Sequence, residues 1–442
     1  MEKTRRNFLK NMAATTSFIS LGGLGFSAKS YGRIVGANDR IAMGVMGTNG
    51  RGAGMAKNFA KQKNTEVLFI CDVEENALAK GVNAVKSVTG QAPGTEKDIR
   101  RLLENKNIDA MLLAPPDHWH APATIMSCVA GKHVYVEKPL CHNPAEGELA
   151  VAAARKYHRV VQMGSQRRSW EILSEGINKI RNGAIGKVYM AKTWYTNNRK
   201  SIGTGKVVPV PATLDYELWQ GPAPRRPYKD NLIHYNWHWF WNWGTGEALN
   251  NGTHEIDVAR WGLGIDYPVK VASAGGRYHF SDDWETPDTQ LITFECAEGA
   301  SVIWEGRSCN GTLVEGEDRG VIFYGTEGSM RIKGNSYLIS DLKGKPLDER
   351  KSDVVIDGRD TSSPAASLDG VHIDNFLKCI REGGTPNADV ETGRKSTLWV
   401  QLGNISQRVG HSIVIDQKGH IVDQDAQKLW GRDYEPGWEI KF

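Results

Sequence analysis

A glycine-rich turn near the start of the chain has the residue types that bind a dinucleotide. Its residues run in the order Gly47-Thr48-Asn49-Gly50-Arg51-Gly52. Such a turn needs glycine for the tight bend, for close approach of the backbone to a pyrophosphate, and for contact between helix and strand. Gly47 and Gly52 occupy the first and third of these positions. Asn49 occupies the second, and asparagine tolerates a positive φ. The motif predicts a cofactor-binding turn that includes Gly47, Asn49, Gly50, Arg51 and Gly52.

Asp72 stands twenty residues after Gly52, at the end of the second predicted strand. An acidic side chain at this place would bond the adenosine ribose hydroxyls of a bound dinucleotide. The next residues, 73–76, include no Arg or Lys to neutralise a 2′-phosphate, which Asp72 itself would repel. The position therefore predicts NAD and disfavours NADP. A flavodoxin-like sheet with an incidental glycine turn is the alternative on the motif alone.

The elements that must position these residues alternate between strand and helix. Unbroken apolar runs predict strands, and runs at helical spacing predict helices, over these residues: strands 41–46, 66–71, 108–114, 133–137 and 160–163; helices 53–62, 121–130 and 144–157. Strands that are apolar throughout belong to a parallel sheet covered on both faces. The fold class is therefore α/β, with a Rossmann-type, doubly wound parallel sheet over residues 38–164. Ligands bind at the carboxyl ends of such strands.

Polar side chains follow two of these strand ends. Pro115, His118 and His120 lie in the expected loop after the third strand, and Glu137 and Lys138 follow the fourth. The two histidines have the spacing of metal ligands, but no acidic or histidine partners accompany them. We therefore predict that all five residues line the cofactor site and that no metal is bound.

The strand-end motifs resemble those of the Gfo/Idh/MocA oxidoreductase family. The Glu137-Lys138-Pro139 motif, the glycine turn, Asp72 and the segment 242–257 carry the resemblance. It implies a second α/β domain, over residues 165–442, built on an open-faced, mainly antiparallel sheet. It also implies C-terminal helices packed back on the Rossmann domain, and nicotinamide chemistry on a small-molecule carbohydrate substrate. An open sheet face usually needs covering, which predicts a homodimer or homotetramer.

Within this resemblance, Lys138 and His254 are the predicted catalytic residues. Hydride transfer from an alcohol requires the hydroxyl proton to leave as well, and histidine titrates near working pH. The base is therefore His254 alone, or His254 with Lys138, whose ammonium would stabilise charge on the substrate oxygen. A core histidine is the alternative for His254. Asn250, where the family usually has Asp, and Asp257 share a predicted helix face with His254 and are predicted to bind substrate.

The segment 236–243 contains four tryptophans in alternation with Asn, His and Phe. Aromatic faces stack on sugar rings, so Trp237 and Trp239 are predicted to bind substrate. The same alternation is equally compatible with one face of a strand, as core or subunit interface. Arg168 and Tyr195 are weaker candidates for the substrate pocket.

The N-terminus resembles an export signal. Arg5 and Arg6 precede a short apolar stretch, 12–26, which ends near small residues, and this order is typical of a twin-arginine signal over residues 1–30. That stretch is too short for a stable membrane span. The prediction is a periplasmic or otherwise exported protein. The net charge of +4 is dispersed, so nucleic acid is not expected as a partner.

Together these features predict an exported NAD-dependent oxidoreductase that acts on a sugar, glycoside or polyol. One alternative is an NAD-dependent, redox-neutral glycosidase, which oxidises C3 transiently and eliminates the aglycone. The other is a redox-silent sugar-binding protein. The substitutions Asn49 and Asn250 keep that last alternative open.

Overall fold

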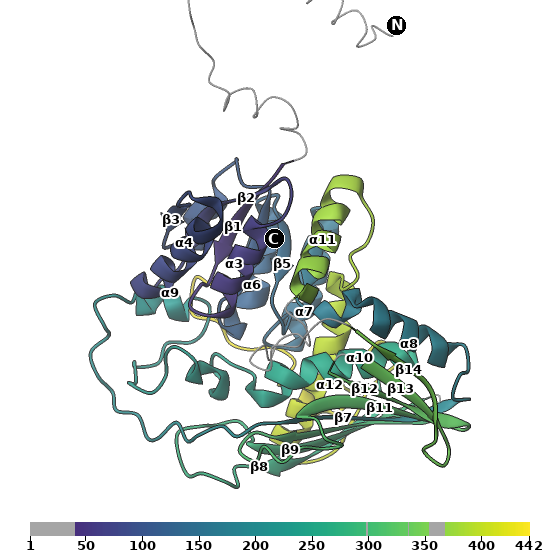
Figure 1. Cartoon of the computed structure of the whole chain (residues 1–442). Helices are drawn as coiled ribbons and strands as arrows, with labels where there is room; N and C mark the ends of the chain where they lie inside the picture. The colour runs from purple at the N-terminus through teal and green to yellow at the C-terminus, as the bar shows by residue number, and fades with distance from the viewer. Residues whose placement is uncertain (1–39, 298, 335, 353–366) are drawn as a thin grey trace, which may run out of the picture. The chain divides into compact units, whose positions relative to one another are not determined.

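Six parallel strands form the first sheet of the computed structural model, in the order β3-β2-β1-β4-β5-β6 (Figure 1). The strands are β1 (Ile41–Met46), β2 (Thr65–Cys71), β3 (Gly94–Glu96), β4 (Ala110–Leu113), β5 (His133–Val136) and β6 (Val161–Met163). After β1 the chain adds β2 and β3 on one side of β1, and then crosses to the other side, where it adds β4, β5 and β6. The connections after β1 and β4 therefore diverge, which opens a crevice at the carboxyl end of the sheet.

The structure describes residues 40–297, 299–334, 336–352 and 367–442. The predicted signal of residues 1–30 lies outside these ranges. Residues 41–442 form one compact unit that contains both sheets of the molecule. Within the described ranges, no helix has the length and apolar character needed to cross a membrane.

Helices cover both faces of the first sheet. They are α3 (Arg51–Ala60), α4 (Glu75–Thr89), α5 (Ile99–Leu103), α6 (Asp117–Val129) and α7 (Pro144–Lys156). Every residue of β1 and β4 is buried, as expected for strands with helices on each side. The predicted doubly wound parallel sheet is confirmed.

The expected loop after the third strand is instead the first turn of α6, so that prediction was wrong. Pro116 precedes the helix with φ of −58°, a value that suits helix entry, and Asp117 places a carboxylate in the first turn. His118 and His120 are therefore helical residues. Their side chains point to different sides of α6, which separates their surroundings.

The second sheet has nine strands in the order β14-β13-β12-β11-β7-β10-β9-β8-β15. They are β7 (Val188–Thr196), β8 (Lys270–Gly276), β9 (Thr289–Cys296), β10 (Ala300–Arg307), β11 (Arg319–Gly325), β12 (Gly328–Lys333), β13 (Ser336–Asp341), β14 (Pro346–Lys351) and β15 (Ile413–Val414). β7 and β10 pair in parallel, and the other neighbours pair antiparallel. The predicted mainly antiparallel sheet is thus confirmed.

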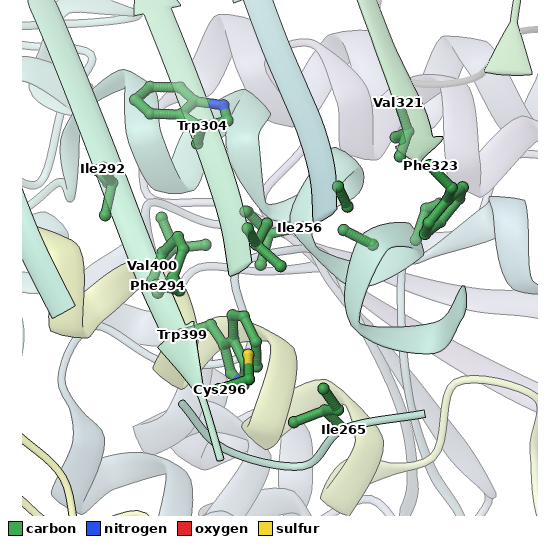
Figure 2. Packing of buried hydrophobic residues seen from close by; sticks show 14 of the residues in the cluster. Ile256, Ile265, Ile292, Phe294, Cys296, Trp304, Val321, Phe323, Trp399 and Val400 are labelled. Carbon is green, nitrogen blue, oxygen red and sulfur yellow. The ribbon is translucent and has the colours of Figure 1, made fainter. Parts of the chain in front are cut away.

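Three helices pack on one face of this sheet: α8 (Glu171–Arg181), α10 (Thr253–Leu263) and α12 (Val390–Val409) (Figure 1). Figure 2 shows part of the core between them, where Ile256 of α10 and Trp399 of α12 lie near Phe294 of β9. Along β9, buried residues alternate with residues that are exposed. The alternation marks the opposite face of the sheet as accessible to solvent.

The long connection between β7 and α10 reaches back to the Rossmann domain. It contains α9 (Tyr216–Gln220), a 3₁₀ turn η2 (Asn236–Trp239) and a π-helical turn η3 (Ala248–Gly252). Its backbone bonds beside the end of β2, where Asp215 N donates to Val73 O at 2.9 Å. It bonds again beside α6, where His118 N donates to Trp243 O at 3.1 Å. The segment 236–243 is therefore no strand, and its tryptophans do not share one face.

Helix α11 (Ser367–Glu382) packs against α3 of the Rossmann domain. Phe376 contacts Phe59 edge-to-face with ring centroids 6.3 Å apart, and Asp369 pairs with Arg51. A last short helix, α13 (Gln424–Gln427), contacts α12. All six cysteines lie in the described part of the chain, where each is buried and free of a disulfide.

The alternation of β9 predicts unequal effects of two neighbouring substitutions. Ile292 is fully buried, and a Cβ added at Gly403 of α12 would lie 2.4 Å from its Cδ1. Ile292→Ala is expected to lower the free energy of unfolding by about 2–5 kcal/mol, because it removes tightly packed methyl groups. Leu291→Ala, at a half-exposed position, should change it by less than about 0.5 kcal/mol. Denaturant titration measures both, and equal losses would contradict the assigned faces.

Candidate active site

A cavity of about 600 Å³ opens at the carboxyl ends of the Rossmann strands. The glycine turn after β1 forms one wall, Pro115 the next, and Asp72 lies at the end of β2. The connection between β7 and α10 contributes the facing wall, which includes Trp219 and Trp237. The cavity therefore lies where the order of the strands diverges, the place at which such sheets bind dinucleotides.

Each glycine of the turn has a separate geometric reason. Gly47 has φ of +82°, and a Cβ there would lie 2.6 Å from the carbonyl oxygen of Ala114. A Cβ on Gly52 would lie 1.7 Å from the carbonyl oxygen of Gly47, so this position demands close helix–strand contact. Gly50 lines the cavity and has no atom within 4 Å of its Cβ position, which leaves room for a ligand beside the backbone.

Asn49 lines the cavity but does not take the left-handed conformation that its residue type allows. Gly47 alone in the turn has a positive φ. The side-chain Oδ1 of Asn49 instead accepts a hydrogen bond of 2.6 Å from Lys80 Nζ. Gly52 lies behind the turn, outside the cavity lining.

The carboxylate of Asp72 is held by backbone amides. Oδ2 accepts from Thr48 N at 2.6 Å, and Oδ1 accepts from Glu74 N at 3.1 Å. Burial raises the pKa of Asp72, and the hydrogen bonds from Thr48 and Glu74 oppose that rise. Lys97 also lines this end of the cavity and pairs with Glu75 at 3.4 Å. That cation was not among the predicted site residues, because it follows the short strand β3, which was not predicted.

Arg51 lines the cavity but is already held by two carboxylates. Its Nε lies 2.9 Å from Glu137 Oε1, and its two Nη atoms lie 2.8 and 2.7 Å from the oxygens of Asp369. These bonds join α3 to the end of β5 and to α11. Arg51 therefore fixes the glycine turn against its surroundings, and Glu137 lies beside it.

Lys138 lies where this cavity meets a second, smaller one of about 140 Å³. Its Nζ donates to the backbone oxygen of Asn250 at 2.5 Å and to its Oδ1 at 3.1 Å. Burial lowers the pKa of Lys138, although Glu137 and Asp117 nearby favour the charged form. The following Lys138–Pro139 bond is cis.

His120 lies beneath the lysine turn and lines the larger cavity. Its ring nitrogens face the carbonyl oxygens of Pro139, at 2.5 Å, and of Pro115, at 2.9 Å. The ring thus connects the two strand-end turns that carry Pro115 and Lys138. His120 is therefore placed to hold these two turns in position at the edge of the larger cavity.

His254 lies in the first turn of α10 and lines the smaller cavity. It is 3% exposed, and no described residue forms a hydrogen bond with its Nε2. Burial lowers the pKa of His254 well below its usual value, and the cations Lys138 and Arg319 lower it further. The imidazole is therefore neutral at physiological pH and has a nitrogen that can accept a proton.

A buried network supports the floor of the smaller cavity. Glu247 accepts hydrogen bonds from the Nδ2 atoms of Asn250, at 3.3 Å, and of Asn251, and it pairs with Arg199 at 3.1 Å. The Oδ1 of Asn251 accepts from Arg319 at 2.7 Å. The π-helical turn η3 makes this possible, since it presents two consecutive asparagines to the same carboxylate.

The predicted substrate residues divide into two groups. Tyr195 and Asn250 line the smaller cavity, and Asn250 and Trp237 line the larger one. Trp237 stacks on His238 with ring centroids 3.6 Å apart. Trp239 lies outside both cavities because it stacks on Trp284 at 3.9 Å.

Arg168 and Asp257 also lie outside both cavities, and they pair with each other at 2.8 Å. Asp257 accepts a further bond from Ser396 of α12, so it faces away from His254. Of the three residues predicted to share a helix face, Asn250 and His254 both line the smaller cavity, whereas Asp257 is turned toward Arg168 and Ser396.

Several lining residues were not among the predicted site residues. They are Lys97, Asn197, Arg199, Trp219, His234, Tyr235, His238 and Asn251. Tyr235 and His238 border or belong to the tryptophan-rich run, which pointed to their neighbourhood. The described residues contain no group of three His, Cys, Asp or Glu side chains arranged for a metal ion.

His118 was predicted to line the cofactor site. It belongs to α6, and its side chain is not part of the lining of either cavity. Its Nε2 is 3.0 Å from the carbonyl oxygen of Trp219, and burial lowers the pKa of His118 to about 3. Between about pH 6.5 and that value, the unfolded chain binds a proton that the folded chain does not. This difference lowers the free energy of unfolding as pH falls, by about 1.4 kcal/mol per pH unit for one such group.

His118→Gln is therefore expected to make the unfolding free energy less sensitive to acid. Denaturant titrations at about pH 7, 6 and 5 measure the slope. His411→Gln is the matched control at an exposed site, where the hydrogen bond to Asp425 raises the pKa of His411. That pair stabilises the fold at low pH and its contribution is lost as pH rises, so the control should shift the slope in the opposite direction. An unchanged slope in His118→Gln would contradict the assignment.

Two family models match the chain. The model described as "Oxidoreductase family, NAD-binding Rossmann fold" matches residues 41–165. The model described as "Oxidoreductase family, C-terminal alpha/beta domain" matches residues 177–415. The second match alone covers more than half of the chain, and the two matches together include both cavities.

Curated relatives and solved structures agree with these matches. A glycosyl hydrolase family 109 protein of Shewanella pealeana is 26% identical over 212 residues, which are 44% of this chain and 46% of the relative. The chain thus spans about half the length of the curated relatives it matches.

Two solved structures share the fold. An aldose-aldose oxidoreductase from Caulobacter crescentus, complexed with glycerol, has a TM-score of 0.64 and 17% identity over 85% of this chain and 100% of its own. The WlbA dehydrogenase from Bordetella pertussis, in complex with NADH and UDP-GlcNAcA, has a TM-score of 0.64 and 19% identity over 85% and 98%. These structures show the same fold, and the Rossmann family match confirms the predicted NAD-binding domain.

Proposed function

The chain belongs to the Gfo/Idh/MocA oxidoreductase family, and we propose that it is an NAD-dependent oxidoreductase acting on a sugar, glycoside or polyol. One observation carries the proposal. Lys138 and His254 meet at a small polar cavity that shares Lys138, Tyr235 and Asn250 with the dinucleotide cavity. A substrate hydroxyl in the smaller cavity would therefore lie beside an ammonium and a neutral imidazole.

The larger cavity fits NAD. Gly47 and Gly52 form a cradle that a Cβ would fill, and Gly50 leaves open space for a pyrophosphate. Asp72 lies at the end of β2, where its carboxylate would bond the adenosine ribose hydroxyls. When bound, NAD supplies the acceptor and donor of a hydride.

The chain's own residues supply the proton chemistry. A ring nitrogen of His254 accepts the hydroxyl proton, because the imidazole lines the smaller cavity and is neutral. Lys138 stabilises negative charge on the substrate oxygen, and Asn250 holds its ammonium in place. Lys138 also shares the proton with His254 in a second version of this proposal, which its lowered pKa supports.

The proposal includes export and self-association. The Arg5-Arg6 pair and the apolar stretch after it support export through the twin-arginine route. The solvent-accessible face of the nine-stranded sheet supports a homodimer or homotetramer. Fractionation of cells that express the full chain, followed by light scattering of the purified protein, tests both.

The central experiment identifies the nucleotide and then its reaction. Mass spectrometry of the denatured protein, purified as expressed, is expected to detect NAD. Addition of sugars and polyols to NAD-loaded protein is expected to produce NADH, measured by its absorbance. Protein that neither carries nor binds NAD would refute the proposal.

Lys138→Ala and His254→Ala are each expected to lower kcat/KM by at least ~10²-fold, because each removes a group that acts on the reacting hydroxyl. His411→Ala, which alters an exposed histidine that lines neither cavity, is the control and should retain wild-type activity. Steady-state kinetics measure the losses, and circular dichroism shows that the fold is kept. Full activity in either site variant would remove that residue from the mechanism.

Asp72→Ala is expected to reduce the preference for NAD over NADP. The substitution removes the ribose-hydroxyl acceptor and the charge that repels a 2′-phosphate. The ratio of the two dissociation constants, measured by fluorescence titration, should move toward NADP. Glu75→Ala, which frees Lys97 without changing Asp72, separates the effect of the neighbouring cation. An unchanged ratio in Asp72→Ala would show that Asp72 does not select the cofactor.

A redox-neutral glycosidase is the second candidate, and the family 109 relatives favour it. Such an enzyme oxidises C3, releases the aglycone and returns the hydride. Incubation with nitrophenyl glycosides distinguishes the two functions. Release of nitrophenol without net NADH supports the glycosidase, whereas NADH that accumulates with the sugar supports the oxidoreductase.

A further inference from the structure

The lining of the smaller cavity contains no carboxylate. Its eight residues all have polar side chains: Lys138, Tyr195, Asn197, Arg199, Tyr235, Asn250, Asn251 and His254. Carboxylates do line the larger cavity, where Asp72, Asp117 and Glu137 are present. Neutral sugars donate several hydroxyl hydrogens, which carboxylates accept well. The small cavity lacks such acceptors and contains two cations.

The side-chain amides of the lining asparagines are oriented by partners that can only donate, or only accept, a hydrogen bond. Asn250 Oδ1 accepts from the ammonium of Lys138, which has no acceptor atom, and its Nδ2 donates to a carboxylate. Asn251 Oδ1 likewise accepts from the guanidinium of Arg319. Asn197 Oδ1 accepts from the backbone N of Asn198 at 2.6 Å. Each of the three amide oxygens thus already accepts one hydrogen bond within the protein.

Three donors on the lining have protons that the protein does not use. The hydroxyl of Tyr195 accepts from Asn197 Nδ2 at 2.6 Å, so its own proton is available. The hydroxyl of Tyr235 accepts a hydrogen bond from Asn250 Nδ2 at 3.5 Å, so the proton of this hydroxyl is also available. Arg199 binds Glu247 through Nε and Nη2, and no described residue accepts from its Nη1.

Arg199 is also rigidly placed. Its guanidinium lies 5.4 Å from the ring centroid of Tyr235 and 4.9 Å from that of Trp239, and it pairs with the buried carboxylate of Glu247. This packing fixes the planar group without using all of its donors. Glu247 offsets the charge of Arg199, and Lys138, whose charged form Glu137 and Asp117 favour, is the second cation of the lining. Burial, the largest cause, raises the pKa of Tyr195 to about 12, so Tyr195 stays a donor.

We infer that the substrate is an acidic sugar, whose carboxylate binds to Arg199 and Tyr195 while its reacting hydroxyl faces Lys138 and His254. A carboxylate brings only acceptor oxygens, which complements a lining with spare donors and engaged acceptors. The inference rests on the proposed function, since it names the class of sugar for the same site. Uronic acids and aldonic acids are monosaccharide derivatives that contain both a carboxylate and hydroxyl groups.

The test measures binding and turnover separately. Calorimetric titration of NAD-loaded protein with D-glucuronate and with D-glucose compares an acid with its neutral counterpart, and glucose 6-phosphate tests a different anion. D-Glucuronate is expected to bind at least ~10-fold more tightly than D-glucose, as one charge-assisted hydrogen bond provides. NADH formation with the same sugars reports the proposed function.

Tyr195→Phe removes one hydroxyl and leaves the ion pair of Arg199 intact. It is expected to weaken D-glucuronate binding about tenfold and to change D-glucose binding much less. Tyr216→Phe is the matched control, because the hydroxyl of Tyr216 is buried, has no partner in the described part of the chain and lines neither cavity. It should preserve the preference for the acid.

Each outcome decides one question. Equal binding of D-glucuronate and D-glucose, or tighter binding of the phosphate ester, would overturn the inference about the carboxylate, even if NADH is formed. A retained preference in Tyr195→Phe would overturn the assigned binding wall. Tighter binding of the acid without NADH formation would support the inference and refute simple net oxidation. Absence of NAD binding would refute the proposed function itself.

Discussion

The hydrogen bonds from Lys138 to Asn250 are the interaction on which the candidate site depends. They join the turn after β5, in the Rossmann domain, to η3, in the second domain. Both cavities include these two residues, so the same contact is the boundary between the dinucleotide space and the substrate space. Burial weakens the charged form of Lys138, and the oxygens of Asn250 compensate by accepting its protons. The ammonium of Lys138 therefore links the two domains where the two cavities meet.

Two carboxylates near this centre, Glu137 and Glu247, are each paired with an arginine. Glu137 forms an ion pair with Arg51. Glu247 forms an ion pair with Arg199 and accepts hydrogen bonds from the side-chain amides of Asn250 and Asn251. Each carboxylate offsets the cost of burying a cation and at the same time orients a donor toward the cavities. Burial lowers the pKa of His254, and the cations Lys138 and Arg319 lower it further. The proposed proton acceptance by His254 and the proposed charge stabilisation by Lys138 thus depend on the same electrostatic surroundings.

The sequence predicted the sheets better than the site. Strands buried on both faces appear as unbroken apolar runs, so the Rossmann order could be anticipated locally. The tryptophan-rich run could not, because alternation fits a strand, yet Trp239 stacks on distant Trp284 and Trp237 faces the cavity. Asp257 has its partner Arg168 89 residues away in the chain, which no local pattern indicates. Motif-bearing residues at strand ends were predictable, whereas the wall from the β7–α10 connection was not.

The family usually has Asp where this chain has Asn250, and the network gives a physical reason for the difference. Asn250 accepts from Lys138 through Oδ1 and donates to Glu247 through Nδ2, so one amide connects a cation to a buried carboxylate. An aspartate there would accept from Lys138 but would oppose Glu247 with like charge at about the same distance. The presence of Glu247 therefore requires a donor at position 250, and the negative charge moves one step away from the substrate. The cavity next to Lys138 consequently keeps its cationic character, on which the proposed binding of an acidic sugar depends.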